Sequence, residues 1–145
     1  MAGMLYLVPT PIGNLGDISA RCREILAQAD FIAAEDTRVS VKLLNHFQIK
    51  SPGELPRTQP CRCGPGHPAA AAGWGVLRSG DGRGTPAISD PGEDLVRLCA
   101  ENGVEVLSIP GCCAAVNALA VSGLPTGRFT FEASSPSTRK AAGNG

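Results

Sequence analysis

The residues best suited to chemistry stand in short loops that follow apolar runs of the chain. In the first loop, five residues are suited to holding a ligand: Pro9, Thr10, Pro11, Gly13 and Asn14. The prolines stiffen the loop, the hydroxyl and amide offer short polar groups, and the glycine lets a ligand approach the backbone. This composition indicates a binding loop, with an ordinary tight connection between strand and helix as the alternative.

The second loop carries two acidic residues beside an arginine, in the order Glu35-Asp36-Thr37-Arg38. Carboxylates next to an arginine at a strand end can orient a substrate or accept a proton. Glu35, Asp36 and Arg38 are therefore candidate catalytic residues. A helix cap at Asp36 or Thr37, together with an ion pair, is the alternative interpretation.

The third loop, Pro110-Gly111-Cys112-Cys113-Ala114, leads into a stretch of small residues. Gly111 permits close contact between backbone and ligand, and the helix N-terminus that follows can hold a cofactor. Candidate cofactor-binding residues here are Pro110, Gly111, Cys112 and Ala114. Close packing of a helix against the sheet is the alternative.

Other patterns exclude some cofactors. Residues 80–86 hold glycines at a spacing unlike the dinucleotide fingerprint, and the residues before them do not resemble a buried strand, so NAD is not expected. Cys61 and Cys63 have no second ligand pair, so no metal is expected there. The remaining cysteines are predicted to be small core residues: Cys22, Cys99, Cys112 and Cys113.

Short apolar runs, typical of strands, alternate along the chain with segments of helical periodicity. The strands and helices that they predict would hold the three loops in place. Strands are predicted at 4–8, 31–34 and 104–109, with a further strand starting at 129–131. Helices are predicted at 17–29 with Asp17 as the cap, at 39–47, from Pro91 to a stop at Gly103, and at 114–122, closed by Gly123. This repeat predicts an α/β fold with a parallel sheet and helices on both faces, which binds ligands beyond the carboxyl ends of its strands.

Length and charge narrow the class of protein. The 145 residues are enough for one domain with a real core. Lys+Arg and Asp+Glu number 13 each, so bulk charge does not hold the chain on RNA or a membrane, although a local basic site stays possible. No apolar run approaches the roughly 20 residues of a membrane span, and the N-terminus does not resemble a signal peptide. We therefore expect a cytoplasmic protein without a membrane partner.

Glycine and proline are concentrated in one window. Between Pro52 and Pro86, 14 of 35 residues are Gly or Pro. We therefore expect residues 52–83 to be irregular, within a domain spanning 1–132. Residues 133–145 are expected to form a disordered tail.

Five blocks of the sequence resemble, in order, the ribosomal RNA small subunit methyltransferase I family of the tetrapyrrole methylase superfamily. The blocks are Leu5–Ile18, Ala34–Arg38, Gly84–Gly92, Ile109–Gly111 and Ser122–Pro125. The resemblance covers roughly residues 4–51 and 84–132. It implies an enzyme that uses S-adenosyl-L-methionine to methylate the ribose 2′-hydroxyl of a cytidine in 16S rRNA of the small ribosomal subunit. It also implies two α/β domains, with the cofactor between them, in a homodimer.

The same resemblance assigns the loops. It places residues 9–14, 110–114 and a middle loop of Gly84, Thr85 and Pro86 on the cofactor side. Asp36 and Arg38 fall on the substrate side, and Glu35 or Asp36 is the candidate base for the ribose proton. Because the sulfonium of the cofactor is already activated, the enzyme would mainly align the ribose oxygen with the methyl group.

Three departures from the family pattern stand out. The chain stops at Gly145, so we expect the second domain to be absent. Asp81-Gly82-Arg83 replaces Ser-Asp-Ala, and Ala133-Ser134-Ser135 replaces Gly-Phe-Leu. The sharp edges of these changes favour a shifted reading frame, with genuine divergence as the alternative.

Two other functions stay open. One is methylation of a tetrapyrrole, against which the Pro-Thr-Pro-Ile-Gly-Asn-Leu opening argues. The other is a remnant without catalysis that folds in part or only dimerises. Because half of the cofactor cleft would be missing, we expect the 145-residue chain alone to have little or no methyltransferase activity.

Overall fold

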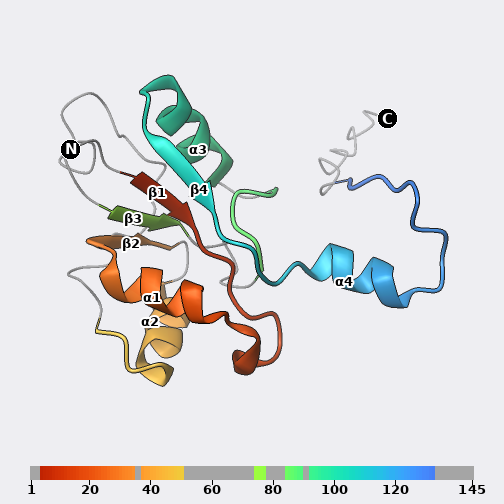
Figure 1. Ribbon diagram of the computed structural model, residues 1–145, viewed down its shortest axis with the longest axis horizontal. Helices are drawn as coiled ribbons and strands as arrows, with labels where there is room; N and C mark the ends of the chain where they lie inside the picture. Colours follow the sequence, from red (N-terminus) through yellow and green to blue (C-terminus); the bar gives the residue numbers. More distant parts are fainter. Residues whose placement is uncertain (1–3, 35–36, 51–73, 78–83, 90–91, 133–145) are drawn as a thin grey trace, which may run out of the picture.

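The computed structural model describes residues 4–34, 37–50, 74–77, 84–89 and 92–132 (Figure 1). Four parallel strands form one sheet in the order β2-β3-β1-β4. Their bounds are β1 (Met4–Leu7), β2 (Phe31–Ala33), β3 (Trp74–Leu77) and β4 (Glu105–Ser108). Tyr6 at the centre of β1 is level with Val76 of β3 and Leu107 of β4. The predicted α/β fold with a parallel sheet is confirmed.

The inner strand β1 and the residue that follows it show why helices must cover both faces of the sheet. Tyr6 and the following Val8 belong to one buried apolar cluster, whereas Leu5 and Leu7 belong to another. Successive side chains of a strand point to opposite faces, so a fully buried run needs a covering layer on each side.

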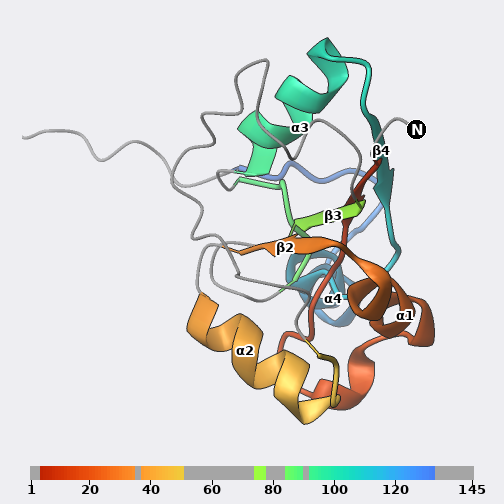
Figure 2. The same ribbon diagram turned by 90° about the vertical axis from the view of Figure 1, so that its left-hand side faces the viewer.

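Three helices supply those layers (Figure 2). Helices α1 (Ala20–Gln28) and α2 (Thr37–His46) cover one face, and α3 (Gly92–Glu101) covers the other. The first layer buries Cys22, Leu26, Leu43 and Leu44 against the sheet, and the second packs Leu95, Val96 and Cys99 against it. Each fully buried leucine of the first layer contributes about 1.5–3 kcal/mol, whereas the packed residues of α3 are half-buried and contribute less.

The start of α1 differs from the prediction. Asp17 ends a short 3₁₀ helix, η1 (Leu15–Asp17), and does not cap α1. The cap is Ser19, whose hydroxyl oxygen accepts a hydrogen bond from the Cys22 amide at 3.1 Å. The Asn14 side chain caps η1 in the same way, accepting from the Gly16 amide at 2.9 Å. Ser19 can cap the helix because the first amides of a helix have no backbone acceptor within it. The Ser19 hydroxyl oxygen is close enough to accept from one of these amides, that of Cys22.

The largest correction concerns the window 52–83, which is not irregular throughout. Trp74–Leu77 form β3, which lies between β2 and β1 in the sheet. The residues before the glycines at 80–86, which do not resemble a buried strand in sequence, thus include a strand. A run of four residues that includes a glycine gives a weak strand signal, and its backbone pairs with strands on both sides. The rest of the window lies outside the described residues, as do 133–145.

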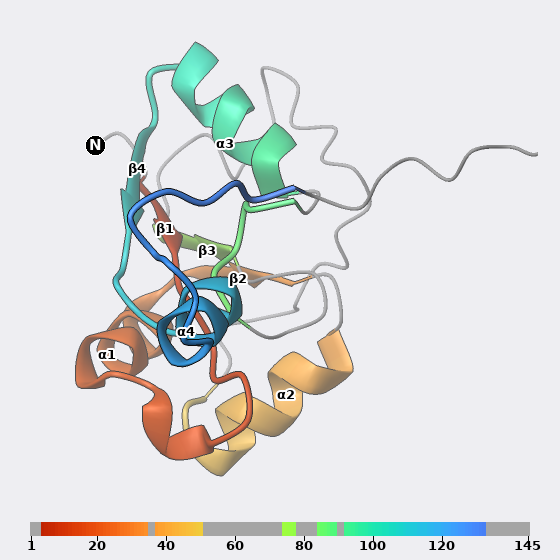
Figure 3. The same cartoon turned by 90° about the vertical axis from the view of Figure 1, so that its right-hand side faces the viewer.

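The C-terminal arm, defined here as residues 114–132, begins with α4 (Ala114–Val121). The arm extends from the carboxyl side of the sheet, and Figure 3 shows α4 in front of the strands when seen from that side. No residue of α4 is buried. The strand predicted at 129–131 does not form, and Phe129 and Phe131 are more than half exposed. Among the described helices, none is both long and apolar enough to cross a membrane.

Candidate functional site

Three of the predicted loops follow three neighbouring strands. Loop A (9–14) follows β1, loop B (84–86) comes after β3, and loop C (110–114) follows β4. Because β3, β1 and β4 are adjacent and parallel, their carboxyl ends meet at one edge of the sheet. The structure therefore brings the three loops together, although loops A and C lie far apart in the sequence.

Backbone hydrogen bonds join loops A and B. The Thr10 amide donates to the Gly84 carbonyl at 3.0 Å, and the Gly84 amide donates to the Thr10 carbonyl at 2.9 Å. These bonds form an isolated antiparallel bridge. Gly84 adopts a φ of 82°, which favours glycine, and an added Cβ would touch the Ile12 side chain at 3.6 Å. The bridge fixes the position of loop B relative to β1.

Loop C is tied to both other loops. The Thr85 hydroxyl donates to the Cys112 carbonyl at 2.9 Å, across 27 residues of sequence. A Cβ added to Gly111 would lie 2.2 Å from Cγ of Pro9, far closer than real contacts allow. Packing against Pro9 alone therefore requires a glycine at this position. The close contact of Gly111 is with loop A, so it is a different contact from the packing of a helix against the sheet that was considered as the alternative.

The predicted cofactor residues divide into a buried support, an accessible rim and two half-buried residues, Thr85 and Cys112. Pro9, Thr10, Pro11, Gly84 and Pro86 are buried. The rim comprises Gly13, Asn14, Pro110, Gly111 and Ala114, which are exposed. A Cβ added to Gly13 would meet no atom within 4 Å. The backbone at Gly13 is therefore open to a ligand, whereas the interior of the cluster is filled by the loops themselves.

The structure adds two residues that the sequence did not single out. Ala87 and Ser89, directly after loop B, have φ values of 62° and 57°. Residues with side chains rarely adopt this left-handed region, and doing so costs on the order of 1 kcal/mol or more. Residue type gave no signal for this conformation. The strained segment follows loop B at the same edge of the sheet.

Of the three predicted catalytic residues, only Arg38 is among the residues that the structure describes. Glu35 and Asp36 lie outside the described residues. Arg38 is exposed in the first turn of α2, directly after the edge strand β2. A helix that follows a parallel strand begins at the carboxyl edge of the sheet, so Arg38 lies at the same edge as loops A, B and C.

The cysteines follow the core prediction only in part. Cys22 is 1% exposed in the core beneath α1. Cys99 is half-buried on α3, where desolvation by burial raises the pKa of its thiol. Cys112 and Cys113 are half-buried loop residues and not core residues, because loop C runs over the sheet edge. Cys61 and Cys63 lie outside the described residues.

Comparisons with known proteins agree with the motifs. Residues 4–142 match the family model for Tetrapyrrole (Corrin/Porphyrin) Methylases. This match runs through the window 52–83, beyond the ranges in which the motifs were recognised.

Several similar proteins are named ribosomal RNA small subunit methyltransferase I. The protein from Synechocystis is 50% identical over 133 residues, which are 90% of this chain and 47% of the relative. Those from Vibrio cholerae and Haemophilus influenzae are 44% and 45% identical over 97% of this chain and 49% and 50% of their own lengths. The chain thus spans about half the length of these relatives. Because the family model matches nearly the whole chain, this protein belongs to the tetrapyrrole methylase family.

Proposed function

We propose that this protein is an S-adenosyl-L-methionine-dependent methyltransferase that acts on 16S rRNA of the small ribosomal subunit. The finer proposal is transfer of the methyl group to the ribose 2′-hydroxyl of a cytidine. The observation that carries it is the meeting of three family motifs, in loops A, B and C, at one edge of the sheet. Relatives that are named for methylation of small subunit rRNA support the choice of substrate.

The residues of the rim suit the cofactor. The open backbone at Gly13 and the exposed Asn14 offer polar contacts beside the half-buried Ile12. S-adenosylmethionine has polar and apolar parts, so a rim of this mixed kind fits it. In this proposal loops A, B and C hold the cofactor, and the buried support keeps the rim in place. When bound, the cofactor supplies an activated methyl group.

The substrate side is proposed to lie at Arg38, Glu35 and Asp36. Arg38 is exposed at the sheet edge, where its guanidinium can hold a phosphate of the RNA. Glu35 or Asp36 would accept the proton that the ribose hydroxyl loses as its oxygen takes the methyl group from the sulfonium, which would leave as a neutral thioether. Alignment of the two reacting groups supplies most of the acceleration in this scheme.

Self-association and location complete the proposal. A homodimer is supported by the arm, where five large apolar side chains are more than half exposed: Val116, Val121, Leu124, Phe129 and Phe131. Such side chains in one segment are typical of an interaction surface. The cytoplasm is the proposed location because small ribosomal subunits are found there.

The first test is methyl transfer from tritiated S-adenosylmethionine to purified small ribosomal subunits. Nuclease digestion and mass spectrometry would then identify the product. Recovery of 2′-O-methylcytidine in 16S rRNA supports the full proposal. A methyl group on a base would support the enzyme class and contradict the ribose assignment.

The same experiment separates the two alternatives. Methylation of uroporphyrinogen in place of rRNA would favour the tetrapyrrole reaction. Calorimetry with S-adenosylmethionine distinguishes a remnant without catalysis, because such a remnant shows neither binding nor transfer. Cofactor binding without transfer would support loops A, B and C as the cofactor side and leave catalysis to a longer form of the protein.

A further inference from the structure

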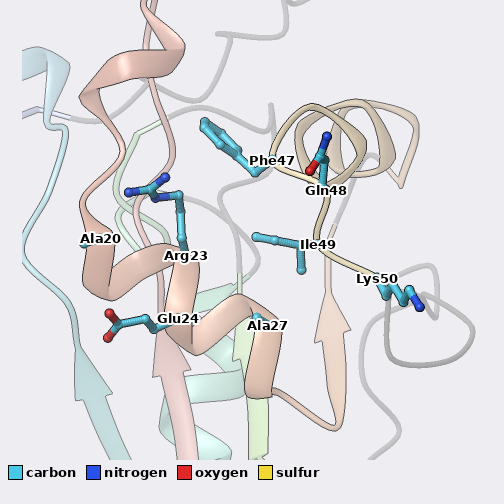
Figure 4. Close-up of a pocket in the computed structure, with 8 residues that line it drawn as sticks. All are labelled: Ala20, Arg23, Glu24, Ala27, Phe47, Gln48, Ile49 and Lys50. Atoms are coloured by element: carbon cyan, nitrogen blue, oxygen red, sulfur yellow. The ribbon is translucent and has the colours of Figure 1, made fainter.

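A hollow lies on the helical layer, apart from loops A, B and C. It occupies about 410 Å³ between α1 and the segment that follows α2 (Figure 4). Arg23 of α1 lines one wall, and Phe47, Ile49 and Lys50 line the other. Neither the family motifs nor the sequence patterns marked these residues.

The end of α2 shapes this wall. The Gln48 amide donates to the Asn45 carbonyl at 3.1 Å, and the Ile49 amide donates to the Leu44 carbonyl at 2.9 Å. These two bonds, with Gln48 at a φ of 57°, form the Schellman motif that commonly ends helices. Glycine usually occupies this left-handed position, as Gly103 does after α3. This turn places the Phe47 side chain beside α1, and the chain then continues along the hollow to Lys50.

Arg23 and Phe47 face each other across the hollow (Figure 4). The guanidinium carbon lies 5.9 Å from the centre of the phenyl ring, within the range of a cation–π contact. The ring itself packs against the core and meets His46 edge-on, with centres 4.8 Å apart. A fixed aromatic ring therefore holds a planar cation at the surface.

Charge is unevenly divided between the two faces of the sheet. Helices α1 and α2 carry four basic residues and one acidic residue, and Lys50 follows them. Helix α3 carries one basic and three acidic residues. Within the described part of the chain, neither Arg23 nor Lys50 makes an ion pair. Helices α1 and α2 are thus net basic, whereas α3 is net acidic.

We propose that this hollow binds a single-stranded segment of RNA. A base stacks on the Arg23 guanidinium, which Phe47 holds in place, and the adjoining phosphates contact Arg23 and Lys50. Unpaired bases stack readily on aromatic rings and guanidinium planes, whereas the bases of a duplex are not available. Glu24 also lines the hollow, and its carboxylate points away from Phe47, so the phosphates lie on the Phe47 side.

This inference rests on the proposed function, because it takes RNA to be the substrate. It adds a contact surface outside the motif loops. Helix α1 begins shortly after loop A and η1, so its first turn, with Arg23, lies toward the edge of the sheet that carries the loops. An RNA strand held at Arg23 is therefore directed toward the proposed reaction site.

Fluorescence anisotropy tests the proposal with a fluorescein-labelled oligocytidylate of about 12 nucleotides, a length within the usual site sizes for single strands. Arg23→Glu and Lys50→Glu are each expected to weaken binding by about tenfold or more. Between roughly 50 and 200 mM salt, each lost phosphate contact should lower the logarithmic salt slope by about 0.7. The matched control Arg97→Glu, on the acidic face, is expected to bind within about twofold of the unmodified chain.

Phe47→Leu supplies a second, independent variant. Leucine keeps an apolar side chain against the core but removes the ring beneath the guanidinium, so we expect weaker binding with an unchanged circular dichroism spectrum. Equal losses in Arg23→Glu and Arg97→Glu would overturn the proposal, as would equal affinity for a duplex of the same length. Displacement of the RNA by polyglutamate at equal charge would also overturn it, in favour of an acidic protein partner.

Calorimetry with S-adenosylmethionine keeps the two proposals separable. The Arg23, Lys50 and Phe47 variants are expected to bind the cofactor as the unmodified chain does. Cofactor binding without any binding of the oligocytidylate would overturn the RNA surface and leave the cofactor side intact. The reverse result would overturn the cofactor side and keep the RNA surface.

Discussion

The cluster of loops A, B and C and the C-terminal arm meet at Ala114, which belongs to both, but they are held very differently. Each loop contacts another through a hydrogen bond or a close packing contact, and five residues of the cluster are buried. The arm contains no buried residue, and Val121 is 85% exposed. Yet α4 consists almost wholly of Ala, Val and Leu, with Asn117 as its single polar residue.

This difference teaches that apolar composition does not by itself decide burial. Five loop residues are buried because adjacent strands bring the loops to one place, where three prolines, Gly84 and Thr10 fit together. The arm follows the last strand and has no sheet face left to cover. A helix that is apolar on all sides normally lies inside a core or an interface, so we expect the arm to be covered by a surface outside the described residues.

The largest effect is expected from Gly111→Val in loop C. Its side chain would begin 2.2 Å from the Pro9 ring, so loops A and C must separate. We expect the free energy of unfolding to fall by about 3 kcal/mol, at the upper end for overpacking, and cofactor binding to be lost. Urea unfolding and calorimetry measure the two effects.

A control for this prediction changes Pro9, the residue that Gly111 packs against. In a Pro9→Ala background the atom at 2.2 Å is absent, so Gly111→Ala should cost less than it does in the unmodified chain. If the two costs are equal, the contact with Pro9 is not the reason for the glycine.

A smaller effect is expected from Thr85→Val, which keeps the shape of the side chain and removes its hydroxyl. The Cys112 carbonyl then loses its donor from loop B. We expect a loss of about 1 kcal/mol in the free energy of unfolding, the usual contribution of one hydrogen bond. Thr85→Ser keeps the hydroxyl and should retain most of the stability. An equal loss in both variants would contradict the role of this bond.

A substitution in the arm is expected to change the free energy of unfolding very little. Val121→Ser is expected to change the free energy of unfolding by less than about 0.5 kcal/mol in dilute solution, because the side chain contacts nothing that must be rebuilt. Self-association, measured by sedimentation equilibrium, is expected to weaken instead. A large loss of stability in the dilute monomer would mean that the arm is held by its own domain.

Much of the fold was predictable because the apolar runs are strong. Residues 5–8 are buried on both faces of the sheet, so this segment of the sequence is an unbroken apolar run. Gly103 and Gly123, which were predicted to end helices, both have the positive φ that favours glycine. The strand at Trp74–Leu77 was missed because four residues beside many glycines carry little periodicity. Its place in the sheet depends on pairing with distant strands, which local sequence does not show.

That loops A and C lie at the carboxyl ends of parallel strands was predictable, but how their residues pack against one another was not. Proline and glycine marked loops A and C, yet only the structure separates Gly111, packed on Pro9, from Gly13, which is open. The strained Ala87 and the hollow beside Phe47 gave no signal, because both arise from contacts and turns rather than from residue type.

The smallest expected effect on stability separates these two glycines. Gly13→Ala adds a methyl group that meets no atom within 4 Å, so the free energy of unfolding should change by less than about 0.5 kcal/mol. If a cofactor lies against this backbone, the same methyl group should weaken calorimetric binding of S-adenosylmethionine by about tenfold, since close approach is blocked. Unchanged binding would place the cofactor away from Gly13, and loop A would then contribute only its buried prolines and Thr10 as support for loops B and C.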